Sequence, residues 1–166
     1  MWYLWPGNTM QKHYTNYPSS GTDIIAFGDS LVSGYGSSDN AGFVSILSRN
    51  TNQEIINLGV DGDTTGQALA RIKQFDRYKP KVVIVLVGGN DYLHRLSMDT
   101  AFTNLATIIE DLQKRGAVVV LVGVRLNQVL GNFDDHYEEL VKKYNVAYVP
   151  NALDGVLGDP KFMSDG

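Results

Sequence analysis

The chain has 166 residues, of which 43% are hydrophobic and 19% charged, a composition typical of one globular domain whose core needs neither a metal nor a disulfide. It contains no cysteine, which excludes a thiol nucleophile and a zinc–thiolate site. The 14 basic and 18 acidic residues give a net charge of −4, and no segment gathers Lys and Arg into a basic stripe, so we expect no nucleic-acid partner.

Residues 1–22 are predicted to form an N-terminal arm or linker. The chain opens with Met1-Trp2-Tyr3-Leu4-Trp5-Pro6, which lacks the basic flank of a signal peptide, and a polar stretch follows from Gln11 to Gly21. No apolar run approaches the roughly 20 residues that cross a bilayer. Two interpretations stay open, a flexible or packed arm and the stub left after removal of an anchor. Membrane contact is expected only in the second case. The compartment stays open, with a periplasmic or otherwise extracytoplasmic place favoured over a cytoplasmic one.

Short β-branched runs alternate with amphipathic stretches from Asp23 onward, a pattern typical of a parallel sheet covered by helices. The predicted strands are Asp23 to Phe27, Glu54 to Leu58, Lys81 to Val87, Ala117 to Val122 and Val146 to Val149.

Three apolar stripes at helical spacing lie between these strands. The first, Leu69, Ile72 and Phe75, follows Thr64 and Thr65, either of which could cap the helix. The second is Phe102, Leu105, Ile108, Ile109 and Leu112, and Gly116 is expected to close it in a left-handed conformation. The third is Phe133, Tyr137, Leu140, Val141 and Tyr144.

These elements predict one α/β domain over residues 23–166, a three-layer α/β/α sandwich with a five-stranded parallel sheet of flavodoxin-like type. In such sheets the reactive groups lie beyond the carboxyl ends of the strands. The loops that follow the predicted strands are therefore the places to look for chemistry.

The loop after the first strand reads Gly28-Asp29-Ser30-Leu31-Val32-Ser33-Gly34-Tyr35-Gly36. A serine at a strand-to-loop turn has an exposed hydroxyl and an N–H that can face an oxyanion, as a nucleophile requires. A helix cap and a phosphate-binding glycine loop are the competing interpretations, although neither the dinucleotide fingerprint nor the P-loop pattern is completed. This loop alone leaves the choice open.

The next two loops supply hydrogen-bond donors suited to acyl transfer. The second, residues 57–65, contains Gly59 and Gly62, whose bare backbone can approach a substrate. The third, Gly88-Gly89-Asn90-Asp91, offers a side-chain amide. Donors of these two kinds stabilise an oxyanion by about 3 kcal/mol each in comparable sites. The aspartates of these loops also suggest a carboxylate metal site, but aspartates flanked by glycine are common in turns, and we expect no metal.

The set Gly28-Asp29-Ser30, Gly62 and Gly89-Asn90-Asp91 resembles the blocks of the SGNH (GDSL-type) hydrolases, and among them the bacterial arylesterase, thioesterase I and lysophospholipase branch. The likeness runs from about Asp23 to the last residue. It implies the SGNH hydrolase fold, no cofactor, and hydrolysis of aryl or short-acyl esters, acyl thioesters or lysophospholipids through an acyl-serine intermediate.

The resemblance also implies roles for single residues. Ser30 would be the nucleophile, and the oxyanion hole would consist of the N–H groups of Ser30 and Gly62 with the side chain of Asn90. Gly59 is the alternative second donor, but Gly62 begins the family's Gly-Asp-Thr segment. Asp29 and Asp91 look like carboxylates that hold the loops, and Asp29 is also a candidate lining residue of the substrate pocket.

The family's last block is an Asp-x-x-His unit, in which the histidine accepts the serine proton and the aspartate orients it. Asp165 matches the aspartate, whereas the histidine position would fall two residues beyond Gly166. We expect the native chain to continue past Gly166, and we expect activity to be impaired without that histidine.

The remaining histidines and one arginine are interpreted as pocket or surface residues rather than as the catalytic base. His94, four residues after Asn90, and Arg125, after the fourth strand, are candidate lining residues of the substrate pocket. Pairing with a carboxylate is the alternative for Arg125. His13 and His136 are interpreted as surface residues. The main rival to an enzyme is a catalytically inactive SGNH-fold binding domain that lacks the base, and the second is a flavodoxin-like nucleotide-binding protein.

Overall fold

The computed structural model of the chain describes residues 13–37, 41–124 and 133–152. These residues contain a parallel sheet with the strand order β2-β1-β3-β4-β5, the flavodoxin-like order in which the winding reverses between β1 and β3. The predicted five-stranded parallel sheet is confirmed, and each predicted strand boundary is within one residue of the observed one. The strands are β1 (Asp23–Gly28), β2 (Ile55–Gly59), β3 (Pro80–Leu86), β4 (Val118–Val122) and β5 (Ala147–Val149).

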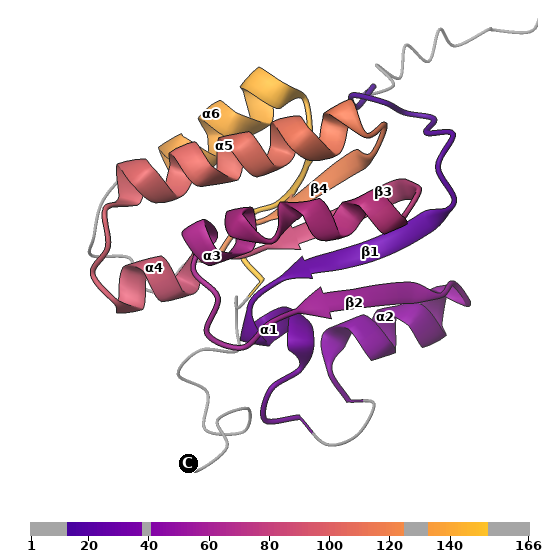
Figure 1. Cartoon of the computed structure of the whole chain (residues 1–166), viewed down its shortest axis with the longest axis horizontal. Coiled ribbons are helices and arrows are strands. Elements are labelled where there is room, and N and C mark those ends of the chain that lie inside the picture. The colour runs from indigo at the N-terminus through magenta and orange to yellow at the C-terminus, as the bar shows by residue number, and fades with distance from the viewer. Residues whose placement is uncertain (1–12, 38–40, 125–132, 153–166) are drawn as a thin grey trace, which may run out of the picture.

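Helices cover both faces of the sheet (Figure 1). On one face lie α1 and α2, and on the other lie α3, α5 and α6 (Figure 1). The described residues contain no helix with the length and apolar character of a membrane span. The helices are α1 (Ser30–Ser33), α2 (Phe43–Thr51), α3 (Thr65–Ala70), the 3-10 helix η1 (Ile72–Arg77), α4 (Gly89–Leu93), α5 (Met98–Lys114) and α6 (Phe133–Tyr144).

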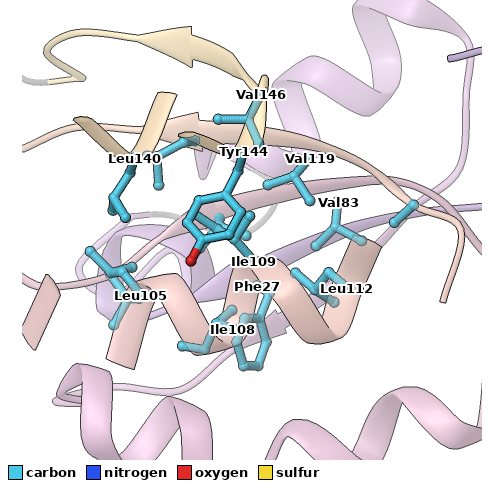
Figure 2. Close-up of a cluster of buried hydrophobic side chains, with 14 of the residues drawn as sticks. Phe27, Val83, Leu105, Ile108, Ile109, Leu112, Val119, Leu140, Tyr144 and Val146 are labelled. Atoms are coloured by element: carbon cyan, nitrogen blue, oxygen red, sulfur yellow. The ribbon is translucent and has the colours of Figure 1, made fainter. Parts of the chain in front are cut away.

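Each strand sends alternate side chains to the two helical layers, because successive residues of a strand point to opposite faces. In β1, Ile25 and Phe27 pack on the α5 side, whereas Ala26 packs on the α1 side. The α5 side holds the larger core, in which Phe27, Ile108 and Leu112 are completely buried (Figure 2). The near-continuous apolar runs of the strands are thus explained by burial on both faces.

Two of the three predicted stripes form single helices. All five apolar residues of the second stripe are buried along α5, and Gly116 follows with a φ of 87°. In α6, Tyr137, Leu140 and Tyr144 are buried, while the side chain of Phe133 lies outside the described part.

The stripe Leu69, Ile72 and Phe75 is divided between two elements. Thr64 caps α3 in a capping box with Gln67, and after Arg71 the chain tightens into η1. Side chains three residues apart lie on the same face of a 3-10 helix, so Ile72 and Phe75 still pack against the core.

Three helices are absent from the sequence prediction. Helices α1 and α4 have four and five residues, too few to display a period. Helix α2 buries only Val44, while Phe43 and Ile46 are 36% and 41% exposed. Its apolar residues therefore give no regular buried stripe.

The described part of the predicted N-terminal arm, residues 13–22, is attached to the ends of α5 and α6. The Thr15 Oγ1 donates to the carbonyl of Tyr144 at 2.9 Å, the Asn16 amide to that of Gln113 at 2.8 Å, and the Ser19 Oγ to that of Gly116 at 2.7 Å. These acceptors lie at carboxyl ends of helices, where carbonyls lack partners within the helix. The arm therefore adds donors to carbonyls at or just past these helix ends, where Gln113 also accepts the Gly116 N–H and Tyr144 also accepts the Gln113 side-chain amide.

Candidate active site

Ser30 is the first residue of α1, directly beyond the carboxyl end of β1. Asp29 caps this helix, since its Oδ1 accepts the Leu31 N–H at 3.0 Å. The Ser30 N–H belongs to the first turn, where N–H groups have no partner within the helix. It donates to no acceptor among the described residues. Ser30 thus has an open N–H beside its hydroxyl.

Two glycines allow β1, α1 and β2 to pack backbone against backbone. A Cβ on Gly28 would lie 1.8 Å from the Leu86 carbonyl oxygen and 2.7 Å from Val32 Cγ2. A Cβ on Gly59 would lie 2.2 Å from the Ser33 nitrogen. A larger residue at position 28 would collide with β3, and one at position 59 would push α1 away from β2, so these glycines fix where Ser30 stands.

The hydrogen bonds of the second loop distinguish the two candidate glycine donors, Gly59 and Gly62. Gly62 has a φ of 78° and no heavy atom within 4 Å of an added Cβ, and its N–H makes no hydrogen bond within the described ranges. The Gly59 N–H, in contrast, donates to Asn57 Oδ1 at 2.9 Å. The open backbone N–H is therefore that of Gly62.

The third loop is held by hydrogen bonds to the second. The Asn90 amide donates one hydrogen to the Asp63 carbonyl at 2.9 Å, which leaves its second hydrogen for another acceptor. The buried Asp91 carboxylate accepts the Thr65 N–H at 2.8 Å and the Thr65 hydroxyl at 2.7 Å. Asp91, the neighbour of Asn90, thus binds the first residue of α3.

The first loop is tied to the second as well. The Val60 N–H donates to the Gly28 carbonyl at 2.9 Å, and the Ser33 hydroxyl donates to the Asp61 carboxylate. The structure therefore gathers the loops that carry Ser30, Gly62 and Asn90 into one hydrogen-bonded unit at the carboxyl edge of the sheet (Figure 1).

Burial alters the acidity of Asp29. Its side chain is only 2% exposed, and desolvation is the largest of the effects that raise the pKa of Asp29 from 3.8 to about 6. The Leu31 N–H opposes this rise, while the nearby carboxylates of Asp63 and Asp91 add to it. Asp29 is therefore a cap that gains a proton in mildly acidic solution.

This acidity predicts a dependence of stability on pH. Between pH 4 and 6 the unfolded Asp29 has lost its proton while the folded one keeps it, so the stability that Asp29 contributes falls as the pH rises. Asn also caps helices well, so Asp29→Asn keeps the cap without the charge. We therefore subtract the unfolding free energy of the unaltered protein from that of Asp29→Asn. This difference should be about 2 kcal/mol larger at pH 7 than at pH 4.

Urea unfolding at pH 4, 5, 6 and 7 measures this difference. Asp99→Asn, which removes the same charge from an exposed aspartate in the first turn of α5, is measured beside Asp29→Asn as the matched comparison. If the difference in unfolding free energy between Asp29→Asn and the unaltered protein stays constant over this pH range, the raised pKa of Asp29 is contradicted.

The remaining predicted residues are placed as follows. His94 is exposed at the end of α4 and is not among the described residues that line the cavity beside Ser30. Asp29 does not line it either. Arg125 and Asp165 lie outside the described residues. His13 is exposed, whereas His136 stacks on Phe102 with ring centres 4.8 Å apart.

The cavity beside Ser30 has a volume of about 860 Å³ and mostly apolar walls. It lies on the α1 and α2 side of the sheet, where Ile84 and Val120 form part of its wall, and Ala152, the last described residue, also lines it. In residues 13–37, 41–124 and 133–152 there is no cluster of three His, Asp or Glu side chains that could hold a metal ion.

Arg71 is a residue at this edge of the sheet that the sequence analysis does not identify. Its guanidinium bonds to Asp63 and to two strand-end carbonyls. A signal exists in the sequence, since Arg71 stands between Leu69 and Ile72 of an apolar stripe. A charged side chain beside a buried stripe needs partners, but the spacing does not say which ones.

Comparison with known proteins identifies the family of this chain. The GDSL-like lipase/acylhydrolase family matches residues 26–165. An arylesterase of Vibrio mimicus is 30% identical over 153 residues, covering 86% of this chain and 76% of the arylesterase. The thioesterase 1/protease 1/lysophospholipase L1 of Escherichia coli is 29% identical over 150 residues, covering 86% and 72%.

A solved structure is similar as well. The crystal structure of AlinE4, an SGNH-hydrolase family esterase, superposes with a TM-score of 0.79 at 39% identity, covering 89% of this chain and 86% of AlinE4. The chain therefore belongs to the GDSL-like lipase/acylhydrolase family and is an enzyme of the SGNH esterase type.

Proposed function

We propose that the protein hydrolyses carboxylic esters or thioesters through an acyl intermediate on Ser30. The observation that carries this proposal is the joining of the Ser30, Gly62 and Asn90 loops by direct hydrogen bonds. Such a unit presents a nucleophile together with preorganised donors, and acyl transfer requires both.

In the first step the Ser30 hydroxyl attacks the carbonyl carbon of the substrate while a base removes its proton. The carbonyl oxygen becomes an oxyanion, which the N–H groups of Ser30 and Gly62 and the free amide hydrogen of Asn90 stabilise. Collapse of this intermediate expels the alcohol or thiol, which takes up the proton. Water then attacks the acyl-serine in the same way and releases the acid.

The base in this proposal is the histidine of the family's Asp-x-x-His unit, oriented by Asp165. That histidine position lies past Gly166. A polypeptide without the histidine would have impaired activity, because the serine hydroxyl is a weak nucleophile at neutral pH unless a base activates it.

The end of α4 and the residues that follow it favour a substrate with an apolar part. Leu93 and Leu96 are 63% and 47% exposed, although they follow directly on the proposed oxyanion hole. They border a cavity of about 500 Å³ together with Tyr92, Arg95 and Met98. Aryl esters, short-acyl esters, acyl thioesters and lysophospholipids all carry such an apolar group, and the names of the relatives above fit this range.

A panel of substrates tests the proposal. The full-length protein is expected to hydrolyse p-nitrophenyl esters, and a series graded by acyl length beside an acyl-CoA identifies the preferred group. Turnover is followed by release of p-nitrophenol or free thiol. A folded full-length protein that turns over none of these substrates would contradict the proposed function.

A further inference from the structure

Arg71 follows the last residue of α3, and its side chain is 21% exposed. Its Nε donates to Asp63 Oδ2 at 2.6 Å, its Nη1 to the Leu58 carbonyl at 3.0 Å and its Nη2 to the Gly28 carbonyl at 2.9 Å. The centre of the Phe27 ring lies 4.3 Å from the guanidinium carbon. One planar group therefore has three acceptors on three backbone segments and an aromatic ring against it.

The two carbonyls belong to the carboxyl ends of β1 and β2. The carbonyl of Gly28, the last residue of β1, also accepts the Val60 N–H at 2.9 Å. Leu58 is the penultimate residue of β2. Because the guanidinium is rigid and planar, it fixes the spacing between these strand ends as well as bonding to each.

Two of the three acceptors of Arg71 are close to the proposed oxyanion donors. Gly28 lies two residues before Ser30. Asp63 follows Gly62 directly, and its carbonyl accepts the Asn90 amide at 2.9 Å. A movement of Asp63 would thus shift the Gly62 N–H and the Asn90 side chain together.

We propose that Arg71 is a positioning residue for the oxyanion hole, whose guanidinium fixes the Ser30, Gly62 and Asn90 donors relative to one another. This inference rests on the proposed ester hydrolysis. Arg71 acts through the backbone of the three loops rather than by contact with the substrate. Lysine cannot replace it, because an ammonium group on a flexible stem lacks the fork that reaches all three acceptors.

The variant Arg71→Lys keeps the charge and removes the fork. Displacing a catalytic group by about 1 Å can cost a hundredfold in rate, so we expect kcat for a p-nitrophenyl ester to fall by about tenfold to a hundredfold. KM should change less than about threefold, because the donors act mainly on the oxyanion of the transition state.

Arg115→Lys is the matched control. The Arg115 side chain is 22% exposed, close to the exposure of Arg71, and it forms ion pairs with Asp76 and Asp111 at the end of α5. Both variants are compared at a temperature where circular dichroism shows them fully folded. We expect kcat of Arg115→Lys to stay within about twofold of that of the unaltered protein, because Arg115 and its two ion pairs lie away from the three loops.

A second measurement detects the position of the three donors and does not depend on enzyme activity. In proton–nitrogen correlation spectra, Arg71→Lys should shift the backbone amides of Ser30 and Gly62 and the side-chain amide of Asn90, whereas Arg115→Lys should leave them in place. If Arg71→Lys does not fold, Asp63→Asn serves instead, because it weakens the charge-assisted bond to Nε. It should shift the same amides and lower kcat in the same direction.

The outcomes separate the two proposals. If the unaltered protein has no esterase activity but the three amides shift in Arg71→Lys, the proposed function is overturned and the positioning role of Arg71 is kept. An active protein in which Arg71→Lys keeps kcat within twofold, raises KM alone or leaves the three amides unshifted would overturn the role of Arg71.

Discussion

Replacement of Ser30 by alanine is expected to lower kcat for p-nitrophenyl esters by about 10⁴-fold or more, because loss of the nucleophile removes the covalent route altogether. Stability should change little, since Asp29 rather than the Ser30 side chain caps α1. Steady-state kinetics with full-length protein measures the effect, and thermal unfolding verifies that the variant is folded.

Ser48→Ala is the matched control for this experiment. Ser48 lies in α2, and its hydroxyl donates to the Gln53 carbonyl, away from the strand ends that carry the site. Its kcat should be unchanged. Undiminished turnover by Ser30→Ala would remove Ser30 from the mechanism.

Asn90→Ala is expected to lower kcat by about 10²-fold to 10³-fold, which is the usual effect of deleting one side-chain donor from an oxyanion hole. KM should change little, because the donor acts mainly on the charge that develops in the transition state. The variant also loses the hydrogen bond from Asn90 to the Asp63 carbonyl, so part of the loss will come from a looser second loop.

A remote amide provides the comparison for Asn90→Ala. The Gln113 side chain donates to the Tyr144 carbonyl at 2.7 Å, near the attachment of the N-terminal arm. Gln113→Ala removes an amide of similar chemistry and should leave kcat within about twofold, as expected for a site remote from the reaction. A rise in KM at constant kcat for Asn90→Ala would assign the Asn90 amide to substrate binding instead.

The winding order of the sheet explains why the three loops meet. β1 lies between β2 and β3, so the loops that leave these strands are neighbours at one edge (Figure 1). The crevice at a reversal of strand order is where ligands bind in such sheets. The site is therefore a consequence of the strand order, and glycines at the strand ends make the close packing possible.

Much of the fold follows from local patterns in the sequence. The strands are predicted to within one residue, because apolar β-branched runs buried on both faces give a strong signal. The stripe from Phe102 to Leu112 likewise identifies α5 and its buried face. Helices α1 and α4 escape prediction because their few residues are set by the cap at Asp29 and by the loop around Asn90.

The site is predictable only in part. Ser30, Gly62 and Asn90 stand out because the resemblance matches them residue by residue, and their roles remain predictions. The contacts of Arg71 span up to 43 residues of sequence, and no local pattern encodes such a separation. The pKa of Asp29 depends on its burial and on carboxylates from two other loops, so it too requires the structure.

The most direct test is to treat the full-length protein with a fluorophosphonate probe, which forms a stable adduct with an activated serine hydroxyl. Tryptic cleavage after Lys12 and Arg49 gives the peptide 13–49, which contains Ser30 and several other serines. Fragmentation by tandem mass spectrometry identifies the modified residue. A single adduct on Ser30, with matching loss of esterase activity, is the predicted result. An adduct on another serine, or unaltered Ser30 in protein that the probe has inactivated, would contradict the assignment of Ser30 as the nucleophile.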